Sequence, residues 1–449
     1  MKPAYWILLL VFASLARGTD WPSYRGPQAS GMAVEAPGPT QWNLKAGTNV
    51  QWSTPIPGLG LSSPVIWGDR VFITTAIAEE GKAELKVGLY GDIKSANDNG
   101  PQSWQVICLA RKTGKILWSK EVHQGIPKSK RHTKSSHANG TVATDGRNVV
   151  AFFGSEGLYC LDFNGELLWS RSFGALHTGY FKMPSAQWGF ASSPIIHRDR
   201  VIVQCDVLKD SFIASLDLKS GEDVWRVPRK EVPTWSTPAI LERPNNPAQI
   251  VVNGFKHIGA YDFLTGKEIW KLEGGGDIPV PTPIFGHGLI YITNAHGKMS
   301  PIYAITMESK GELNPEDDAS SNVAWWIQRG GNYMQTPILV RDLLFACSDS
   351  GVLSCFDAKS GERHFKKRLR SGKSGFGFTA SPVSDGRNLY FCTEDGRVFI
   401  VAAEKEFRLI AENTLGETSC MASPALADGS LYVRTRDRLV AIGPASAPK

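Results

Sequence analysis

The sequence predicts an all-β protein, an eight-bladed β-propeller built from four-stranded antiparallel blades. Three observations lead to this prediction: an internal repeat of blade length, a high content of glycine and tryptophan, and a last repeat that lacks one strand. The 449-residue chain contains 45 Gly and 14 Trp, which suits many short strands joined by tight turns with aromatic anchors between them.

The opening half of the repeat is a Ser or Thr followed by Pro and a short apolar strand. Its clearest copy is Ser193-Pro194-Ile195-Ile196, and Asn139-Gly140-Thr141-Val142 is a degenerate copy. The other openings begin at Ser63, Thr237, Thr282, Thr336, Ser381 and Ser423. Most are spaced by the ~40–50 residues that four short strands and their turns require, and their count predicts eight blades.

The closing half is an Asp, a turn that contains Gly, and a Trp four residues after that Gly, as in Asp217 to Gly221 to Trp225. Gly supplies the positive φ that the turn between the third and fourth strands requires, and Trp can wedge between neighbouring sheets. The closing half is weaker in blades five and seven. We expect the following residues to dock neighbouring blades: Trp52, Trp118, Trp169, Trp225, Trp270 and Trp326.

The last repeat, from Ser423 to Ile442, holds three strands and then ends without its Trp strand. The missing strand stands at the other end of the chain, in the segment Gly47 to Trp52. Pairing the two would close the ring and leave no open sheet edge, so Trp52 should share a sheet with Leu431 to Val433. We therefore predict one domain over residues 19–443, followed by a tail over 444–449, rather than two unrelated all-β domains.

The N-terminus has the features of a secretory signal over residues 1–18. Lys2 precedes an apolar run of about ten residues, and small residues allow cleavage after Ala16 or Gly18. A membrane anchor is the alternative, but the run is shorter than the ~20 residues that a spanning helix needs. No Cys lies near the cleavage site, which argues against a lipid anchor. We expect an exported, periplasmic protein with no membrane-spanning segment.

Composition and motifs narrow the possible functions. The net charge of +6 is modest for this length and gives no reason to expect nucleic-acid binding. Seven cysteines cannot all pair, and most stand in apolar strand patterns, where free Cys packs as a small hydrophobic side chain. Motifs for zinc proteases, serine hydrolases and nucleotide-binding loops do not occur.

The Asp-x-x-(Thr/Ser)-Gly-x-x-x-Trp pattern resembles the pyrroloquinoline-quinone-type (PQQ-type) repeat propellers and covers most of the chain. Two groups share it: the PQQ-dependent alcohol and sugar dehydrogenases, and cofactor-free propellers that include the lipoprotein of the outer-membrane barrel-assembly machinery. The resemblance implies the fold but not the cofactor, because its Trp packs blades. Family dehydrogenases hold PQQ and Ca²⁺ in the central funnel, often with a disulfide between adjacent cysteines. This chain has no adjacent cysteines and no matching Ca²⁺ ligands, so we expect no cofactor and no metal.

Two kinds of segment indicate where a ligand could bind. In a propeller, the segment that leads into the first strand of each blade crosses one face at the mouth of the central channel. Four of these segments carry aromatic or Met side chains, which either plug the channel or contact a ligand. The aromatic candidates are Trp188, Phe190, Trp235, Tyr333 and Phe376.

The second kind of segment is an insertion. Residues 79–104 lengthen a turn of blade one, and residues 119–138 lengthen the crossing to blade two, on the same face. The second insertion carries Arg131, His132 and Lys134, so this basic loop is either a solvated surface or a site for an anion. His123, His132 and His137 match no standard metal-site spacing.

These observations predict a monomeric, non-catalytic propeller that binds a protein partner or a small anionic ligand. The alternative function is a PQQ-dependent oxidoreductase that acts on alcohols or sugars. In either case we expect the working surface on the face of the channel mouth, beside blades one and two, because both insertions should meet there.

Overall fold

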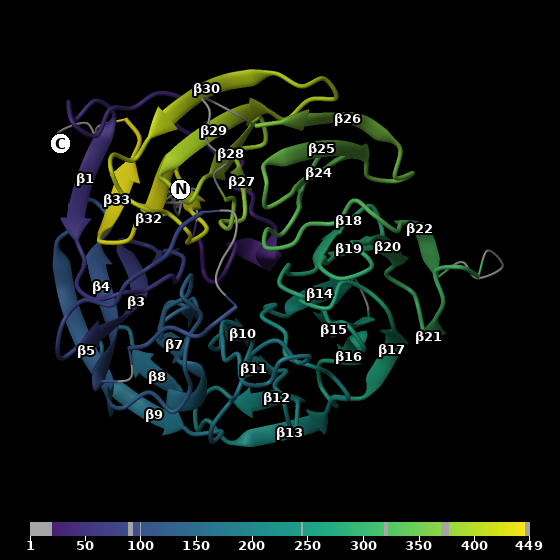
Figure 1. Ribbon diagram of the computed structural model, residues 1–449, viewed down its shortest axis with the longest axis horizontal. Coiled ribbons are helices and arrows are strands. Elements are labelled where there is room, and N and C mark those ends of the chain that lie inside the picture. The colour runs from purple at the N-terminus through teal and green to yellow at the C-terminus, as the bar shows by residue number, and fades with distance from the viewer. Residues whose placement is uncertain are drawn as a thin grey trace, which may run out of the picture.

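The structure is a computed structural model that describes residues 20–88, 93–98, 100–243, 246–317, 322–369 and 377–444. The predicted signal over 1–18, Phe376 and the tail after 444 lie outside these residues. The described chain forms eight antiparallel sheets arranged in a ring, as predicted (Figure 1). Its helical residues within these ranges form two 3₁₀ turns, η1 (Pro27–Ala29) and η2 (Gly154–Glu156). Neither of these helices is long and apolar enough to cross a membrane.

The blades follow one another along the chain, and the innermost strand of each comes first. Blades one to four consist of β2 (Val65–Trp67), β3 (Arg70–Ala78), β4 (Gln102–Ala110) and β5 (Ile116–Gly125); β6 (Ala143–Thr144), β7 (Asn148–Phe152), β8 (Leu158–Asp162) and β9 (Leu167–Arg171); β10 (Ile195–His197), β11 (Arg200–Cys205), β12 (Phe212–Asp217) and β13 (Asp223–Pro228); and β14 (Ala239–Arg243), β15 (Asn246–Val252), β16 (Ile258–Asp262) and β17 (Glu268–Leu272).

Blades five to eight complete the ring in the same way. They consist of β18 (Ile284–Gly286), β19 (Leu289–Thr293), β20 (Ile302–Thr306) and β22 (Val323–Ile327); β23 (Ile338–Val340), β24 (Leu343–Cys347), β25 (Val352–Asp357) and β26 (Arg363–Arg368); β27 (Val383–Ser384), β28 (Asn388–Cys392), β29 (Arg397–Ala402) and β30 (Leu409–Thr414); and β31 (Ala425–Ala427), β32 (Ser430–Arg434), β33 (Arg438–Ile442) and β1 (Val50–Pro55).

The ring closes where the two ends of the chain meet. Strand β1 pairs antiparallel with β33, with Trp52 opposite Ala441, in the sheet that also contains β32 (Figure 1). The prediction that Trp52 shares a sheet with Leu431 to Val433 is therefore confirmed. Because blade eight takes its strands from both ends, no sheet in the described chain lacks a neighbour on either side.

The opening residues bond neighbouring blades near the channel at six of the eight junctions. Their backbone N–H groups donate to the hydroxyl of the opening residue in the following blade, as from Ser193 to Thr237 at 3.0 Å and from Thr336 to Ser381 at 2.9 Å. The same bond links blades one to two, two to three, five to six and seven to eight. All eight opening residues are buried, so at these six junctions the Ser or Thr hydroxyl is an acceptor that water cannot replace.

The closing residues bond the blades at the rim. Gly221 and Gly266 both have φ of 72°, and an added Cβ would lie within 2.7 Å of the ring of Trp169 or Trp225, respectively, from the preceding blade. The indole N–H of Trp225 donates to the carbonyl of Phe263 at 3.1 Å, in the same turn. Glycine is therefore required twice over, for its backbone conformation and for the space beneath the tryptophan.

Two of the tryptophans expected to dock neighbouring blades, Trp326 and Trp270, have surroundings that differ from the other anchors. In blade five Trp325, rather than Trp326, has the register of the other anchors, and its indole N–H donates to Ala358 at 2.9 Å. A bulge just before Trp325, at Ala324, sets this register, and Trp326 stacks on Tyr303 instead. Trp270 is fully buried, whereas Trp225 is half-buried, because a fifth strand, β21 (Gly311–Leu313), pairs with β17 and covers Trp270.

The insertions of blade one extend its strands. Strands β3 and β4 each have nine residues and β5 has ten, whereas most strands elsewhere have three to six. Residues 102–104 and 119–125, which we expected in loops, therefore continue the sheet. Blade one thus projects beyond the face on which the innermost strands begin, which we call the lead-in face.

The other face is covered by residues 20–42. Trp21 forms a two-way backbone bridge with Ile66, and Ala33 donates to the carbonyl of Ser384 at 2.9 Å. Between them Arg25, which is 1% exposed, donates to the carbonyls of Pro337 and Pro382. Helix η1 lies near the middle of the ring in Figure 1. This segment ties blades one, six and seven together across the channel.

Replacing Trp225 with Ala should lower the free energy of unfolding by about 3 kcal/mol, because the change removes a half-buried indole that packs on Gly266. Urea denaturation measures this loss. Leu264→Ala is the control, since Leu264 is 56% exposed in the same turn and its loss should cost under about 0.5 kcal/mol. A loss below about 1 kcal/mol for Trp225→Ala would contradict a docking role.

Candidate functional site

The lead-in face carries a row of aromatic side chains across the channel mouth. Trp188 stacks on Tyr180 with ring centroids 5.9 Å apart and an interplanar angle of 2°, and it lies 5.6 Å from Trp235. Both indoles are anchored, because Trp188 donates to the carbonyl of Ile93 at 3.0 Å and Trp235 donates to that of Gly189 at 2.8 Å. Trp188 and Trp235, which were expected at the mouth, therefore lie on this face with their ring orientations held by hydrogen bonds.

The two insertions meet, as expected, beside this row. Ser95 forms an isolated bridge with His132, and Ala96 donates to the carbonyl of Arg131 at 2.7 Å. His132 in turn donates its backbone N–H to Trp188 at 2.9 Å and packs edge-on against the Trp188 ring. The insertions and the aromatic row thus form one continuous surface.

The basic residues of the second insertion are held by acceptors within the protein. Arg131 is 1% exposed, and its guanidinium bonds the carboxylate of Asp98 at 2.6 Å and three backbone carbonyls. Burial alone would raise the pKa of Asp98, but the hydrogen bond from His137 and the charge of Arg131 outweigh it and lower that pKa. Arg131 therefore stabilises the loop and offers little to an external anion.

Lys134 is paired in the same way, with a carboxylate far away in sequence. Its ammonium bonds Glu394 of blade seven at 2.8 Å, and Glu394 is 2% exposed. Glu394 also accepts from the amide of Gly88 at 2.7 Å, so this contact ties the first insertion to blade seven. The positive charge that the sequence concentrates in this loop is largely neutralised within the fold.

The remaining aromatic candidates have separate surroundings. Phe190 packs against Phe152 at 4.7 Å and belongs to the core between blades two and three. Tyr333 stacks on His296 at 5.8 Å on the lead-in face. Phe376 lies outside the described residues.

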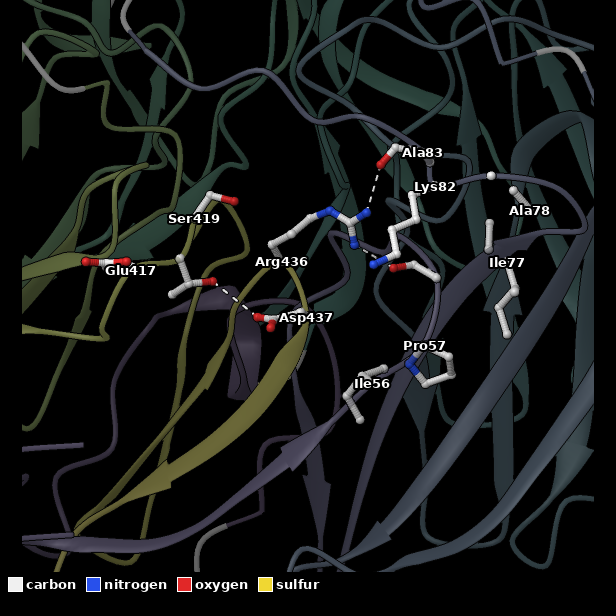
Figure 2. Close-up of a pocket in the computed structure, with 14 residues that line it drawn as sticks. Ile56, Pro57, Ile77, Ala78, Lys82, Ala83, Glu417, Ser419, Arg436 and Asp437 are labelled. Carbon is white, nitrogen blue, oxygen red and sulfur yellow. Dashed lines mark hydrogen bonds between the residues drawn. The ribbon is translucent and has the colours of Figure 1, made fainter. Parts of the chain in front are cut away.

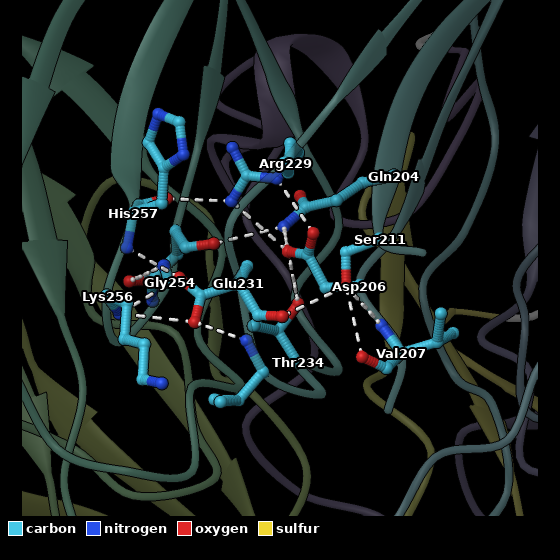
Figure 3. Close-up of polar contacts among 12 residues, drawn as sticks. Gln204, Asp206, Val207, Ser211, Arg229, Glu231, Thr234, Gly254, Lys256 and His257 are labelled. Carbon is cyan, nitrogen blue, oxygen red and sulfur yellow. Dashed lines mark hydrogen bonds and ion pairs between the residues drawn. The ribbon is translucent and has the colours of Figure 1, made fainter. Parts of the chain in front are cut away.

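A buried polar network holds the segment that leads to Trp235 (Figure 3). Asp206 and Arg229 are both fully buried and form a two-bond ion pair, with Nε to Oδ1 at 2.7 Å. The hydroxyl of Thr234 donates to Asp206 at 3.0 Å, which fixes the backbone beside Trp235. Breaking one partner of such a pair leaves a buried charge, so the network imposes one conformation on this segment.

Glu231 completes the network from the same segment. Its carboxylate accepts backbone N–H groups from Val232, Phe255, Lys256 and His257, and a Cβ on Gly254 would lie 2.3 Å from its oxygen. Burial, reinforced by the charge of Asp206, raises the pKa of Glu231 to about 7.

A groove of about 600 Å³ opens between blades eight and one (Figure 2). Ile77, Ala78 and Lys82 line one wall and Glu417 and Ser419 line the other. Its floor includes Arg436, whose guanidinium donates to the carbonyls of Gly58 and Ala83, both at 2.7 Å. The groove exists because the longer strands of blade one stand above the neighbouring blade. Sequence reasoning located the insertion but not the hollow behind it.

A second polar cluster, around Asp277, was also not expected from the sequence. Asp277 leads into blade five, is 3% exposed, and accepts hydrogen bonds from Tyr180, Lys182 and the Nδ1 of His296. The hydrogen bonds from Lys182 and His296 outweigh burial and lower the pKa of Asp277. The run of three glycines before Asp277 was the available signal, since a Cβ on Gly276 would lie 2.0 Å from the Ala295 carbonyl.

No group of three or more His, Cys, Asp or Glu side chains in the described ranges is arranged to hold a metal ion. All seven cysteines are buried and free, which confirms that they pack as small hydrophobic side chains.

Comparison with known proteins gives one matching family model. A model described as outer membrane protein assembly factor BamB matches residues 102–367 and 243–406. Among solved structures, BamB from Moraxella catarrhalis is similar with a TM-score of 0.54 and 16% identity, over 82% of this chain and 98% of that chain. Quinohemoprotein alcohol dehydrogenase from Comamonas testosteroni has a TM-score of 0.62 and 13% identity, over 97% and 82%. At these identities the likeness shows the fold alone.

A curated relative is similar over a shorter region. Tetrathionate hydrolase from Acidithiobacillus ferrooxidans is 26% identical over 201 residues, which span 42% of this chain and 37% of the hydrolase. The matched region is therefore little more than a third of that relative.

Replacing Glu231 with Gln should remove a pH dependence of stability. The raised folded pKa of Glu231 means that its contribution is fully present below about pH 4.5 and is lost as pH rises through about 7. The free energy of unfolding of Glu231→Gln, relative to the unmodified protein, should therefore rise by about 3 kcal/mol between these limits. Urea titrations at several pH values measure this difference. Glu222→Gln, at an exposed position in blade three, is the control, and a flat difference for Glu231→Gln would contradict the assignment.

Proposed function

The chain belongs to the family described as outer membrane protein assembly factor BamB, and on this premise we propose that it is an exported, non-catalytic propeller that holds a partner protein in the cell envelope. The observation that carries this proposal is the groove between blades eight and one. It is the hollow that blade one's insertion creates, and long segments on a rigid scaffold commonly carry function. The description of the family as an outer membrane protein assembly factor supports a role in holding another protein.

The groove suits an extended segment of a partner. Ala76 exchanges both backbone hydrogen bonds with Leu59, so its N–H and C=O point away from β4. In an antiparallel ladder alternate residues point the same way, and Ala78 therefore presents its N–H and C=O to the groove. A peptide could add to this edge as a short strand, with Lys82 and Glu417 flanking it.

The anchoring of the groove favours binding without rearrangement. The Arg436 guanidinium bonds the carbonyls of Gly58 and Ala83 beside blade one, and its backbone N–H donates to Ser419 at 2.8 Å, so both sides of the groove are bonded to the same residue. Because the floor is already bonded, a partner segment loses little free energy to ordering the site.

Crosslinking within the cell envelope tests this proposal. A photo-reactive amino acid in place of Lys82 should capture a partner, and the same group in place of Lys115, exposed on the opposite face, should not. Adding Ala78→Pro should abolish the product at position 82, because proline removes the N–H that faces the groove. Capture that is equal at both positions, or unaffected by Ala78→Pro, would contradict the proposal.

The rival function, a PQQ-dependent oxidoreductase, has a separate test. Purified protein is mixed with PQQ and Ca²⁺, and the quinone absorbance and alcohol-dependent dye reduction are measured. A non-catalytic propeller should show no saturable quinone spectrum and no dye reduction above the protein-free control. A bound quinone together with dye reduction would contradict the non-catalytic proposal and would support the oxidoreductase.

A further inference from the structure

The cluster around Asp277 joins three separate segments at the channel mouth. Tyr180 and Lys182 come from a small hairpin in the crossing from blade two to blade three, which is closed by a bridge between Gly179 and Gln187. Asp277 comes from the segment leading into blade five, and His296 comes from the turn between β19 and β20. The hairpin therefore reaches across the mouth to meet blade five.

The hydrogen bonds to Asp277 leave free donors on the outer side. The Nδ1 of His296 and one N–H of the Lys182 ammonium are directed at the carboxylate. The side chains of His296 and Lys182 are 41% and 54% exposed, respectively. Because both side chains are well exposed, a molecule outside can reach the Lys182 ammonium and the Nε2 of His296.

The position of His296 is held by its surroundings. Its φ of 84° is unusual for a residue other than glycine, and such strain persists only where neighbours impose it. Asn294, two residues earlier, is fully buried and accepts the backbone N–H of Gly276 at 2.6 Å. The Tyr180 and Tyr333 rings flank the imidazole, edge-on at 5.5 Å and stacked at 5.8 Å, and so fix its plane.

Unpaired buried groups lie on the same side of the mouth. Asn332 and Gln335, on either side of Tyr333, are 1% and 0% exposed, and neither the oxygen nor the nitrogen of either amide has a partner among the described residues. Gly331 touches the turn that carries His296, because its Cβ would lie 2.7 Å from the Asn294 carbonyl. Buried amides are normally bonded, so this mouth is built to receive polar groups.

We propose that His296 and Lys182, backed by Asp277 and flanked by Tyr180 and Tyr333, bind a small oxyanion at the channel mouth. The Lys182 ammonium is 54% exposed beside Asp277, and its positive charge favours an anion over a neutral ligand. The ammonium supplies a charge-assisted hydrogen bond to an oxygen, with the His296 ring beside it, whether that oxygen belongs to a phosphoryl group or to a carboxylate. This site lies on blade five and does not depend on the groove at blades eight and one.

The test uses inorganic phosphate and succinate as separate probes, each titrated at several pH values. The His296 ring resonance, assigned with His296→Asn, should shift saturably with at least one probe. Asparagine tolerates positive φ, so this variant removes the ring without straining the turn. A response to phosphate alone assigns a phosphoryl ligand, and a response to succinate alone assigns a carboxylate.

Variants of Lys182 separate binding from a structural role. Lys182→Met should weaken binding about tenfold, whereas Lys182→Arg should keep it within about threefold. Lys267→Met, at an exposed lysine on the opposite face, is the matched control and should bind as the unmodified protein does. Phosphate or succinate, whichever binds, should also raise the melting temperature of the unmodified protein more than that of Lys182→Met at the same concentration. No shift with either probe, or equal binding by Lys182→Met, would overturn the proposal.

Discussion

Neighbouring blades are linked at two radii, by opening hydroxyls near the channel and by tryptophans at the rim, and this double linkage is the constraint on which the rest of the structure depends. Near the channel, a backbone N–H meets the Ser or Thr hydroxyl of the next blade, as from Ser193 to Thr237. At the rim, the Trp225 indole packs over Gly266 and donates to the same turn. Neither linkage tolerates a shifted neighbour, so pairing β1 with β33 fixes the whole ring at once.

A ring held in this way leaves few surfaces free to vary. The face opposite the lead-in segments is covered by residues 20–42, with Arg25 bonded to two blades. Variation is concentrated on the lead-in face, where blade one stands higher and the hairpin at Tyr180 crosses the mouth. The groove and the Asp277 cluster are therefore both products of segments added to a conserved geometry rather than of the ring itself.

The sequence predicted the features that recur in every blade. It could not predict which side chains from different blades and insertions form ion pairs. Eight openings, the turn glycines and the split last blade were sufficient for the blade number and the closure. The partners of Arg131 and Lys134 were missed because Asp98 and Glu394 stand 33 and 260 residues away, a separation that no local pattern records. Asp277 and His296 were missed for a further reason: a positive φ at a histidine has no signature in the residue type.

The internal pairing of the basic loop changes how charge can act on this face. Arg131 and Lys134, the two basic residues expected to attract an anion to this loop, are each paired with a carboxylate of the fold. Attraction at long range depends on uncompensated charge and falls off over the screening length of about 10 Å. Recognition here must therefore be local and depend on donors that are already aimed, and the exposed Lys182 ammonium is such a donor.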